Sequence, residues 1–506
     1  MLRVALAAIL ALFFSTASMV RAQAPGTLDL SFNAGTGNAI ISMGVTQDGW
    51  RAVVIQPDGK IVAAGTCVSS SLKQFCLARF ASDGTIDSTF GTAGKQFTTI
   101  GSADASAIGL ALQPDGKIVL AGSCGPTNNA VFCVARYLST GALDTLNFGV
   151  NGVVVAPAVA GVTNAVASGM AQQGDGKIVV AGTCGTATFR FCVGRFTAVG
   201  ALDTSFAAVG VTTTVVGSAS SVANAVVLQP DGYVVLGGQC TDPGLSLVHF
   251  CLVRYASNGN PDSLFGSGGI FIGPMIGISS GEILYALALQ PDGKLVAGGQ
   301  CITVAGGVDF CLMRVNAVGT ADTTFGSAGK VTVAISGGTN ADQLYSLLIM
   351  PDGRIVTAGG CFTAGGSEDM CVARHNPDGS IDPTFGTAGK TVSALSVVAD
   401  FANAGTLQAD GKLVFAGHCI ASGPSGGGYC IARYSGGPFG YRTCSLDLDG
   451  DGRVLATTDV LMQARIALGM SGAAVTNGIA FAANATRSTW ADIRTYLVTQ
   501  CGMTLP

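Results

Sequence analysis

The chain has 506 residues, of which only 11% are charged, and its formal net charge at pH 7 is −4. Charged residues make up about a quarter of an average globular protein, so this low charge, together with 73 glycines, predicts many short strands and tight turns rather than long helices or disorder. The sequence has no Lys/Arg cluster, and we therefore expect no nucleic-acid partner.

The N-terminus has the three parts of a Sec-type signal peptide. Arg3 supplies a positive charge, VALAAILALFF is a short apolar run, and Ala22-Gln23-Ala24 is a small-x-small cleavage site. We predict that residues 1–24 are removed after Ala24 and that the protein is exported to the periplasm, the cell surface or the medium. A membrane anchor is the alternative, but the apolar run is short for one, and no later stretch is long and apolar enough to span a bilayer.

The cysteines reveal a repeat. There are 16 of them, and behind a signal peptide an even number predicts disulfides. The first cysteines of successive close pairs are 57, 60, 56, 61, 60 and 58 residues apart, which gives a period of about 59 residues. The expected pairs are 67/76, 124/133, 184/192, 240/251, 301/311, 361/371, 419/430 and, near the end, 444/501.

One unit reads as four antiparallel strands. In the second copy, AIGLAL precedes the turn QPDG, KIVLAGSC follows it, FCVARY is a third strand, and GVVVA after the phrase ALDTLNFGVNG is a fourth. The paired cysteines then end the second strand and begin the third. Four antiparallel strands per repeat are typical of a β-propeller blade, and the seven copies predict an all-β, seven-bladed propeller.

The fourth-strand phrase is displaced in one copy. It follows only six of the seven units, and its seventh copy, GTLDLSFNAGTG, stands at 26–37. We therefore predict that residues 25–43 complete the last blade of a propeller spanning 25–436. An open solenoid is the alternative, but it would need a capping unit at each end.

An Arg and an Asp eight residues apart recur in the units. The interpretation we favour is a pair that pins one strand to the next turn, and the alternative is a ring of ligand-binding charges. Arg433 lacks a downstream Asp and Asp29 is left over, so we expect these two to pair across the closure. The other pairs are 79/87, 136/144, 195/203, 254/262, 314/322 and 374/382. We expect the Phe of the phrase, such as Phe90, to pack in the core.

These units resemble the delta-60 repeat, a bacterial family with the pattern LQPDGKIVxAG followed by RxxxxGxLDxxFGxxG. The resemblance covers about residues 26–436. It implies a secreted or surface protein of the β-propeller type, and it carries no catalytic residues over to this chain.

The repeat pattern does not continue into the C-terminal part, residues 437–506. The stretch DLDGDGRVLATTD at 447–459 matches an EF-hand-type loop, with carboxylates at Asp447, Asp449 and Asp451 and the carbonyl of Arg453 as further ligand. The expected acid at position 12 comes one residue late, as Asp459. We predict that these five residues bind one Ca²⁺; the alternative is a solvated acidic turn.

Two helices are predicted after this loop, 459–468 and 490–498, the second capped by Ser488. A calcium loop followed by a helix resembles a type I dockerin repeat, so residues 437–506 are interpreted as a small, helical, dockerin-like module. Dockerins pair two such loops, however, and only one is visible in this sequence.

No catalytic motif stands out in the sequence. We therefore expect a secreted, non-catalytic, monomeric binding or structural platform whose ligand is a protein or a glycan. The most divergent segments, the loop between Cys240 and Cys251 and residues 271–283, are the expected contact sites. The alternative is a secreted carbohydrate-active enzyme, a hydrolase or lyase, because the acidic pairs that cleave glycosides are placed in space rather than in sequence.

Overall fold

The structure is a computed structural model, which describes residues 23–43, 49–69, 71–242, 244, 247–278, 281–303, 307–337, 340–363, 366–420, 428–437, 448, 457–458, 461–467, 470–481 and 485–499. Residues 1–22, most of the predicted signal peptide 1–24, lie outside these ranges. Within them, no helix is both long and apolar enough to cross a membrane.

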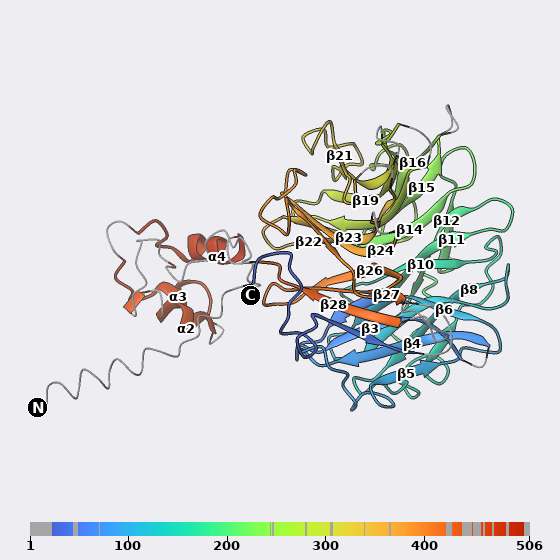
Figure 1. Ribbon diagram of the computed structural model, residues 1–506, viewed down its shortest axis with the longest axis horizontal. Helices are drawn as coiled ribbons and strands as arrows, with labels where there is room; N and C mark the ends of the chain where they lie inside the picture. Colours follow the sequence, from blue (N-terminus) through green and yellow to red (C-terminus); the bar gives the residue numbers. More distant parts are fainter. Residues whose placement is uncertain are drawn as a thin grey trace, which may run out of the picture.

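Sheets of four antiparallel strands recur along the chain (Figure 1). The first three sheets contain β2 (Trp50–Ile55), β3 (Ile61–Ser69), β4 (Leu72–Phe80) and β5 (Lys95–Thr98); β6 (Ala105–Leu112), β7 (Ile118–Cys124), β8 (Val131–Tyr137) and β9 (Val153–Val155); and β10 (Val166–Gln172), β11 (Ile178–Cys184), β12 (Arg190–Phe196) and β13 (Val211–Thr214). Two more contain β14 (Val222–Leu228), β15 (Val234–Thr241), β16 (Val248–Tyr255) and β17 (Ile270–Ile272); and β18 (Ile283–Leu289), β19 (Leu295–Ile302), β20 (Val308–Val315) and β21 (Lys330–Val333).

The remaining strands form one eight-stranded sheet that consists of two such units. These are β22 (Asp342–Ile349), β23 (Ile355–Phe362), β24 (Glu368–His375) and β25 (Lys390–Ser393), and then β26 (Ala399–Leu407), β27 (Leu413–Ile420), β28 (Gly428–Tyr434) and β1 (Asn38–Ile41). A single parallel bridge between Glu368 and Ala399 joins the two units. The chain is thus all-β in its repeats, with the four-stranded units that the sequence predicts.

The predicted turn joins the first two strands of each unit. In the second unit, the Gly116 N–H donates to the carbonyl of Gln113 (2.9 Å) and the Lys117 N–H to the carboxylate of Asp115 (3.2 Å). Gly116 has a φ of +80°, a conformation that a residue with a Cβ adopts only with strain. The QPDG sequence therefore fixes the hairpin by local chemistry.

Disulfides link the second and third strands of all seven repeats, which confirms the pairing expected for these cysteines. The bridges are Cys67–Cys76, Cys124–Cys133, Cys184–Cys192, Cys240–Cys251, Cys301–Cys311, Cys361–Cys371 and Cys419–Cys430. Cys444 and Cys501 lie outside the described residues, and their bridge stays a prediction.

The N-terminal segment joins the last repeat, as the repeat count predicts. β1 pairs antiparallel with β28, with Asn38 opposite Ala432 and Ile41 opposite Tyr429. The last repeat in turn contacts the first, because the Asn403 side chain donates to the carbonyl of Trp50 (3.0 Å). The two ends of the repeat array therefore meet (Figure 1).

The core lies between neighbouring sheets. The Phe of each fourth-strand phrase is at most 2% exposed, as expected: Phe32, Phe90, Phe148, Phe206, Phe265, Phe325 and Phe385. Glycine makes room for these rings, because a Cβ on Gly141 would lie 2.9 Å from the Phe90 ring of the preceding unit.

Helices α2 (Leu461–Ala467), α3 (Ala473–Thr476) and α4 (Trp490–Thr499) follow the strands. They share a small core that contains Met462, Val475, Ile493 and Leu497. The predicted cap of α4 was wrong by one residue: Thr489, rather than Ser488, accepts the N–H of Asp492 (3.2 Å). The Asp492 carboxylate accepts the Thr489 hydroxyl in return (2.6 Å), a reciprocal cap that Ser488 does not make.

Candidate functional site

A β-bulge interrupts the first strand of every repeat. In each case the pairing register with the second strand skips one residue, which is left without a partner. Such bulges re-aim a side chain relative to the regular alternation of the strand. The skipped residues are Arg51, Ile108, Ser168, Asn224, Tyr285, Tyr345 and Asn403.

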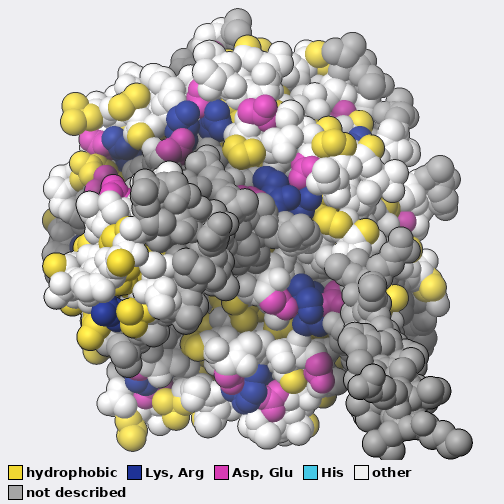
Figure 2. All heavy atoms as spheres, turned by 90° about the vertical axis from the view of Figure 1, so that its left-hand side faces the viewer, with side chains coloured by type: hydrophobic (Ala, Val, Ile, Leu, Met, Phe, Trp, Pro, Cys, Tyr) yellow, Lys and Arg dark blue, Asp and Glu magenta, His cyan; other side chains and the backbone are white. Residues whose placement is uncertain are grey.

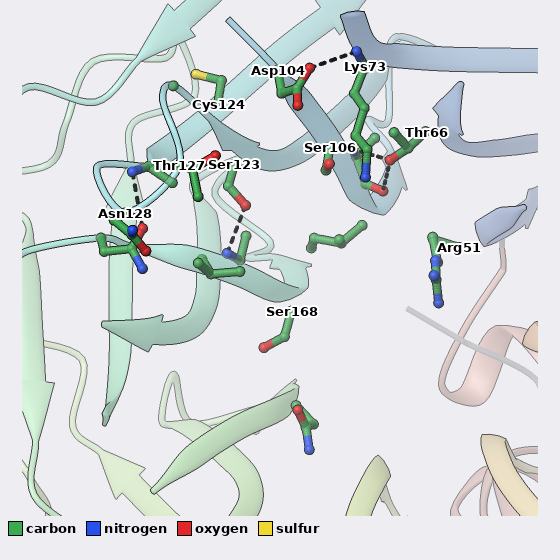
Figure 3. A pocket seen from close by; sticks show the side chains of 18 of the residues that line it. Arg51, Thr66, Lys73, Asp104, Ser106, Ser123, Cys124, Thr127, Asn128 and Ser168 are labelled. Atoms are coloured by element: carbon green, nitrogen blue, oxygen red, sulfur yellow. Dashed lines mark hydrogen bonds between the residues drawn. The ribbon is translucent and has the colours of Figure 1, made fainter. Parts of the chain in front are cut away.

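All seven bulge residues line one cavity of about 710 Å³. This convergence requires the first strands to lie innermost, around a common axis. Other parts of the lining come from the second repeat, where Asp104 directly precedes β6 and Asn128 lies in the loop between β7 and β8. Figure 3 shows Arg51 on one side of the cavity and Asn128 on the other, with Ser168 between them.

Three of the bulge residues also hold neighbouring first strands together. Asn224 donates to the carbonyl of Leu284 (2.8 Å), and Ser168 donates to that of Ala223 (2.5 Å). Asn403 makes the equivalent contact with Trp50. Each acceptor directly precedes the bulge residue of the next repeat. These polar side chains thus have a structural role as donors, while their oxygens accept no hydrogen bond from the described part of the chain.

The other polar bulge residues make no such link. The Tyr285 and Tyr345 rings meet edge to face, with their centroids 5.1 Å apart. Burial raises the pKa of Tyr345, and nearby Tyr285 and Glu368 raise it further, whereas the charge of Arg51 lowers it. The Tyr345 hydroxyl donates to the Gln343 side chain. Tyr285 and Tyr345 give the cavity an aromatic side, and Arg51 gives it an exposed guanidinium.

The Arg–Asp pairs predicted from the sequence form in all seven repeats. Their N–O distances are 2.6–2.8 Å, and Arg433 pairs with Asp29 as expected. Each guanidinium also lies 4.5–4.7 Å from the ring centre of the Phe in the fourth-strand phrase of its own unit. The pairs are therefore built into the packing.

Every one of these arginines also donates to a carbonyl of the following repeat. Arg79, for example, donates to Ser139 (2.6 Å), and Arg433 donates to Ser82 in the first repeat (2.5 Å). On the face shown in Figure 2, basic and acidic side chains lie beside one another in separate groups rather than in a patch of one sign. The scaffold interpretation of the Arg–Asp pairs accounts for these contacts.

Glu368, at the start of β24, is a buried acid that the sequence analysis did not single out. It is 8% exposed, and its Oε1 atom has no hydrogen-bond partner among the described residues. Burial raises the pKa of Glu368 to about 7. Glu368 is not among the described residues that line the cavity.

The segments expected to make contacts lie elsewhere. None of the described residues in the loop between Cys240 and Cys251, or in 271–283, lines the cavity. The predicted calcium ligands Asp447, Asp449, Asp451, Arg453 and Asp459 lie outside the described residues.

Sequence reasoning missed the bulge residues, although a signal for them exists. Each stands five residues before the first residue of the QPDG-type turn, as Tyr285 does before Gln290. At that place the seven repeats carry Arg, Ile, Ser, Asn, Tyr, Tyr and Asn. A fixed place with varying polar and aromatic residues can mark a site, but its convergence is visible only in three dimensions.

Comparisons with known proteins agree on the repeat. Six segments, 56–90, 113–146, 173–206, 229–265, 290–325 and 351–385, match the family model described as "Domain of unknown function (DUF5122) beta-propeller". A search among curated proteins found no significant match.

Solved structures with similar folds include polysaccharide lyase Uly1 (11% identity, TM-score 0.43, covering 83% of this chain and 98% of that one). Two others are Chaetomium thermophilum Sqt1 (11%, 0.40, 80% and 99%) and Penicillium chrysogenum alpha-L-arabinanase with arabinobiose (11%, 0.40, 79% and 97%). The six matched segments, together with the recurring four-stranded sheets, identify the chain as a repeat β-propeller protein.

Proposed function

We propose that this protein is a secreted, non-catalytic binding propeller of seven blades that takes its ligand in the cavity lined by the bulge residues. The blades are the five separate sheets and the two halves of the eight-stranded sheet, so that the propeller spans 25–436. The meeting of the first and last repeats supports a closed ring. The seven disulfides support export after cleavage near Ala24, because such bonds persist in oxidising compartments.

One observation carries the binding function. The scaffold residues, such as the Arg–Asp pair and its Phe, recur in each repeat, whereas the residues that converge on the cavity are of five different types among the seven repeats. If the bulge residues had only a structural role, we would expect one residue type to recur at this place, as it does for the scaffold residues. Concave sites with a few convergent polar groups are the usual places for ligands.

The alternative is a carbohydrate-active enzyme. Glycoside hydrolysis commonly uses two carboxyl groups on either side of the scissile bond. Among the described residues that line the cavity, Asp104 is the single carboxylate, and it accepts the backbone N–H of Lys73 (3.0 Å). This lining favours binding over hydrolysis.

A cavity-filling variant tests the proposal. Full-length protein is screened against glycan and peptide arrays beside Ile108→Trp, which places an indole in the cavity, and Val318→Trp, which places one at a position that is 60% exposed and outside the cavity lining. We expect ligand capture to be lost only in Ile108→Trp. Equal capture by both variants would show that the ligand binds elsewhere, and release of reducing ends from a captured glycan would favour the enzyme.

We further propose that residues 437–506 form a dockerin-like module that binds one Ca²⁺ through Asp447, Asp449, Asp451, the Arg453 carbonyl and Asp459. The support is the sequence pattern of the loop and the small helical core of α2–α4. Such a module would attach the propeller to a partner protein while the cavity remains open.

A further inference from the structure

Two exposed cationic side chains, Arg51 and Lys73, line the cavity. Its charged lining residues, within the described chain, are Arg51, Lys73 and Asp104. The Arg51 side chain is exposed, and it makes no ion pair or hydrogen bond with a described residue. This contrasts with the arginines of the Arg–Asp pairs, whose side chains are at most 11% exposed and each of which binds an Asp carboxylate. A guanidinium that faces a cavity without a partner is suited to bind a carboxylate.

The cavity is also rich in hydrogen-bond acceptors. Asn224 and Asn403 each donate an Nδ2 N–H to a backbone carbonyl, and their Oδ1 atoms accept no hydrogen bond from a described residue. The Ser168 hydroxyl donates its proton in the same way, so that its oxygen retains an accepting lone pair. A ligand that satisfies these groups must bring several donors, as a polyhydroxylated molecule does.

An aromatic surface completes the lining. Tyr285 and Tyr345 come from neighbouring first strands, and both side chains are half-buried, so part of each ring faces the cavity. Aromatic rings offer a flat apolar surface with a polar edge. The C–H face of a pyranose ring can pack on such a surface while its hydroxyl groups reach the Asn and Ser oxygens.

From these three features we propose that the cavity binds an oligosaccharide that carries carboxylate groups, with Arg51 as the partner of one carboxylate and the Tyr285–Tyr345 pair as the platform for a sugar ring. This inference rests on the proposed binding function and specifies its ligand class. The cavity volume of about 710 Å³ lies within the range of about 300–1,000 Å³ that small-ligand sites occupy, which is enough for a few sugar units.

The test compares a charged probe with its neutral counterpart. Full-length protein is titrated calorimetrically with tetragalacturonic acid and with the same oligosaccharide as its methyl ester. We expect Arg51→Gln to weaken binding of the acid by about 10- to 100-fold and to leave binding of the ester unchanged, because only the acid loses a charge-assisted contact. Arg190→Gln, an exposed arginine outside the cavity, is the matched control and should bind both probes as the parent does.

The aromatic platform has its own readout. Tyr345→Leu should weaken binding of the acid and the ester alike, whereas Tyr345→Phe, which keeps the ring, should retain most of the affinity. Thermal unfolding of each variant shows whether it is folded.

The outcomes separate the two proposals. Equal affinity of the parent for acid and ester, unchanged binding of the acid by Arg51→Gln, or no binding of either probe would overturn the inference. Tighter binding of an Asp-rich peptide than of the acid would also overturn it. Binding of the ester alone, abolished by Ile108→Trp, would overturn the ligand class and leave the binding cavity in place. Binding that survives Ile108→Trp would overturn the proposed function itself.

Discussion

Asp29 shows how single residues contribute to the closure of the array. Burial by itself would raise the pKa of Asp29, but hydrogen bonds from Ser31 and Lys412 and the charge of Arg433 lower it to about 2. Because the pKa in the folded state is below the usual 3.8, Asp29 stabilises the fold above about pH 4, and this contribution is lost as the pH falls towards 2.

Asp29→Asn should therefore lower the free energy of unfolding at pH 7 by about 2–4 kcal/mol, because it leaves Arg433 buried without its counter-charge. Urea unfolding measures this value. Asp58→Asn is the control: its carboxylate is 55% exposed, and its loss should cost less than about 0.5 kcal/mol. Equal effects of the two substitutions would contradict a special role for the closure pair.

Glu368 gives the opposite pH dependence. Its pKa is raised from 4.5 to about 7 by burial, so the folded protein binds a proton that the unfolded chain has released. Stability contributed by this proton is present below pH 4.5 and is lost as the pH rises to about 7.

Glu368→Gln should remove this loss. Relative to the parent, the variant should gain on the order of 2 kcal/mol between pH 5 and pH 8, because the neutral amide has no buried charge to form. Urea unfolding at the two pH values measures the difference. Parallel pH profiles of parent and variant would show that Glu368 ionises freely in the folded protein.

At the scale of elements, the N-terminal segment takes the place of a turn and strand that the last repeat lacks. Gly26 has a φ of +85°, and Gly141, which occupies the equivalent turn in the second repeat, has +91°. Joining Gly437 directly to Gly26 would place Asp29 eight residues after Arg433, which is the spacing in the other six repeats. The break in the chain thus falls inside a turn whose geometry is kept.

Two chain rearrangements test this placement. Deleting 25–43 should lower the melting temperature by several degrees, because β28 loses its partner strand and Arg433 its counter-charge, a loss of roughly several kcal/mol in a large domain.

A circular permutant that runs from 44 to 437 and continues directly into 26–43 should recover the stability of a parent chain that spans 25–437. A permutant as unstable as the deletion would refute the assignment of 26–43 to the last repeat.

At the scale of the whole molecule, the propeller and the C-terminal helices have separate cores. The helices pack around Met462 and Ile493, whereas the repeats pack sheet against sheet. Such separate cores allow one part to respond to an ion while the other keeps its structure.

Calcium should therefore act on the C-terminal part alone. We expect the full-length protein to bind one Ca²⁺, detected by calorimetric titration, and Asp447→Ala to abolish this binding, because three carboxylates are needed to offset the dehydration of the ion. The melting transition of the propeller should be the same in both proteins. Undiminished Ca²⁺ binding by Asp447→Ala would rule out the predicted loop.

Much of the repeat could be predicted because its determinants are local. The QPDG turns, the disulfides of the hairpins and the Arg–Asp offset of eight residues all act between neighbours in one unit, so each leaves a periodic trace. The cap of α4 was missed because Ser488 and Thr489 are chemically alike, and only the backbone geometry selects Thr489.

The sequence by itself determined the four-stranded unit and the disulfides of its hairpins, because the turns, the cysteines and the Arg–Asp pairs recur at fixed offsets within each repeat. It also determined the return of residues 26–37 to the last repeat, because that repeat alone lacks the fourth-strand phrase and its Asp. Only the tertiary structure decided where a ligand can bind. Arg51, Tyr285 and Tyr345 are far apart in the chain, and they share a cavity because a bulge turns each of them and the packing of successive sheets brings the first strands around one axis. That convergence depends on the angle between sheets, which no single repeat encodes.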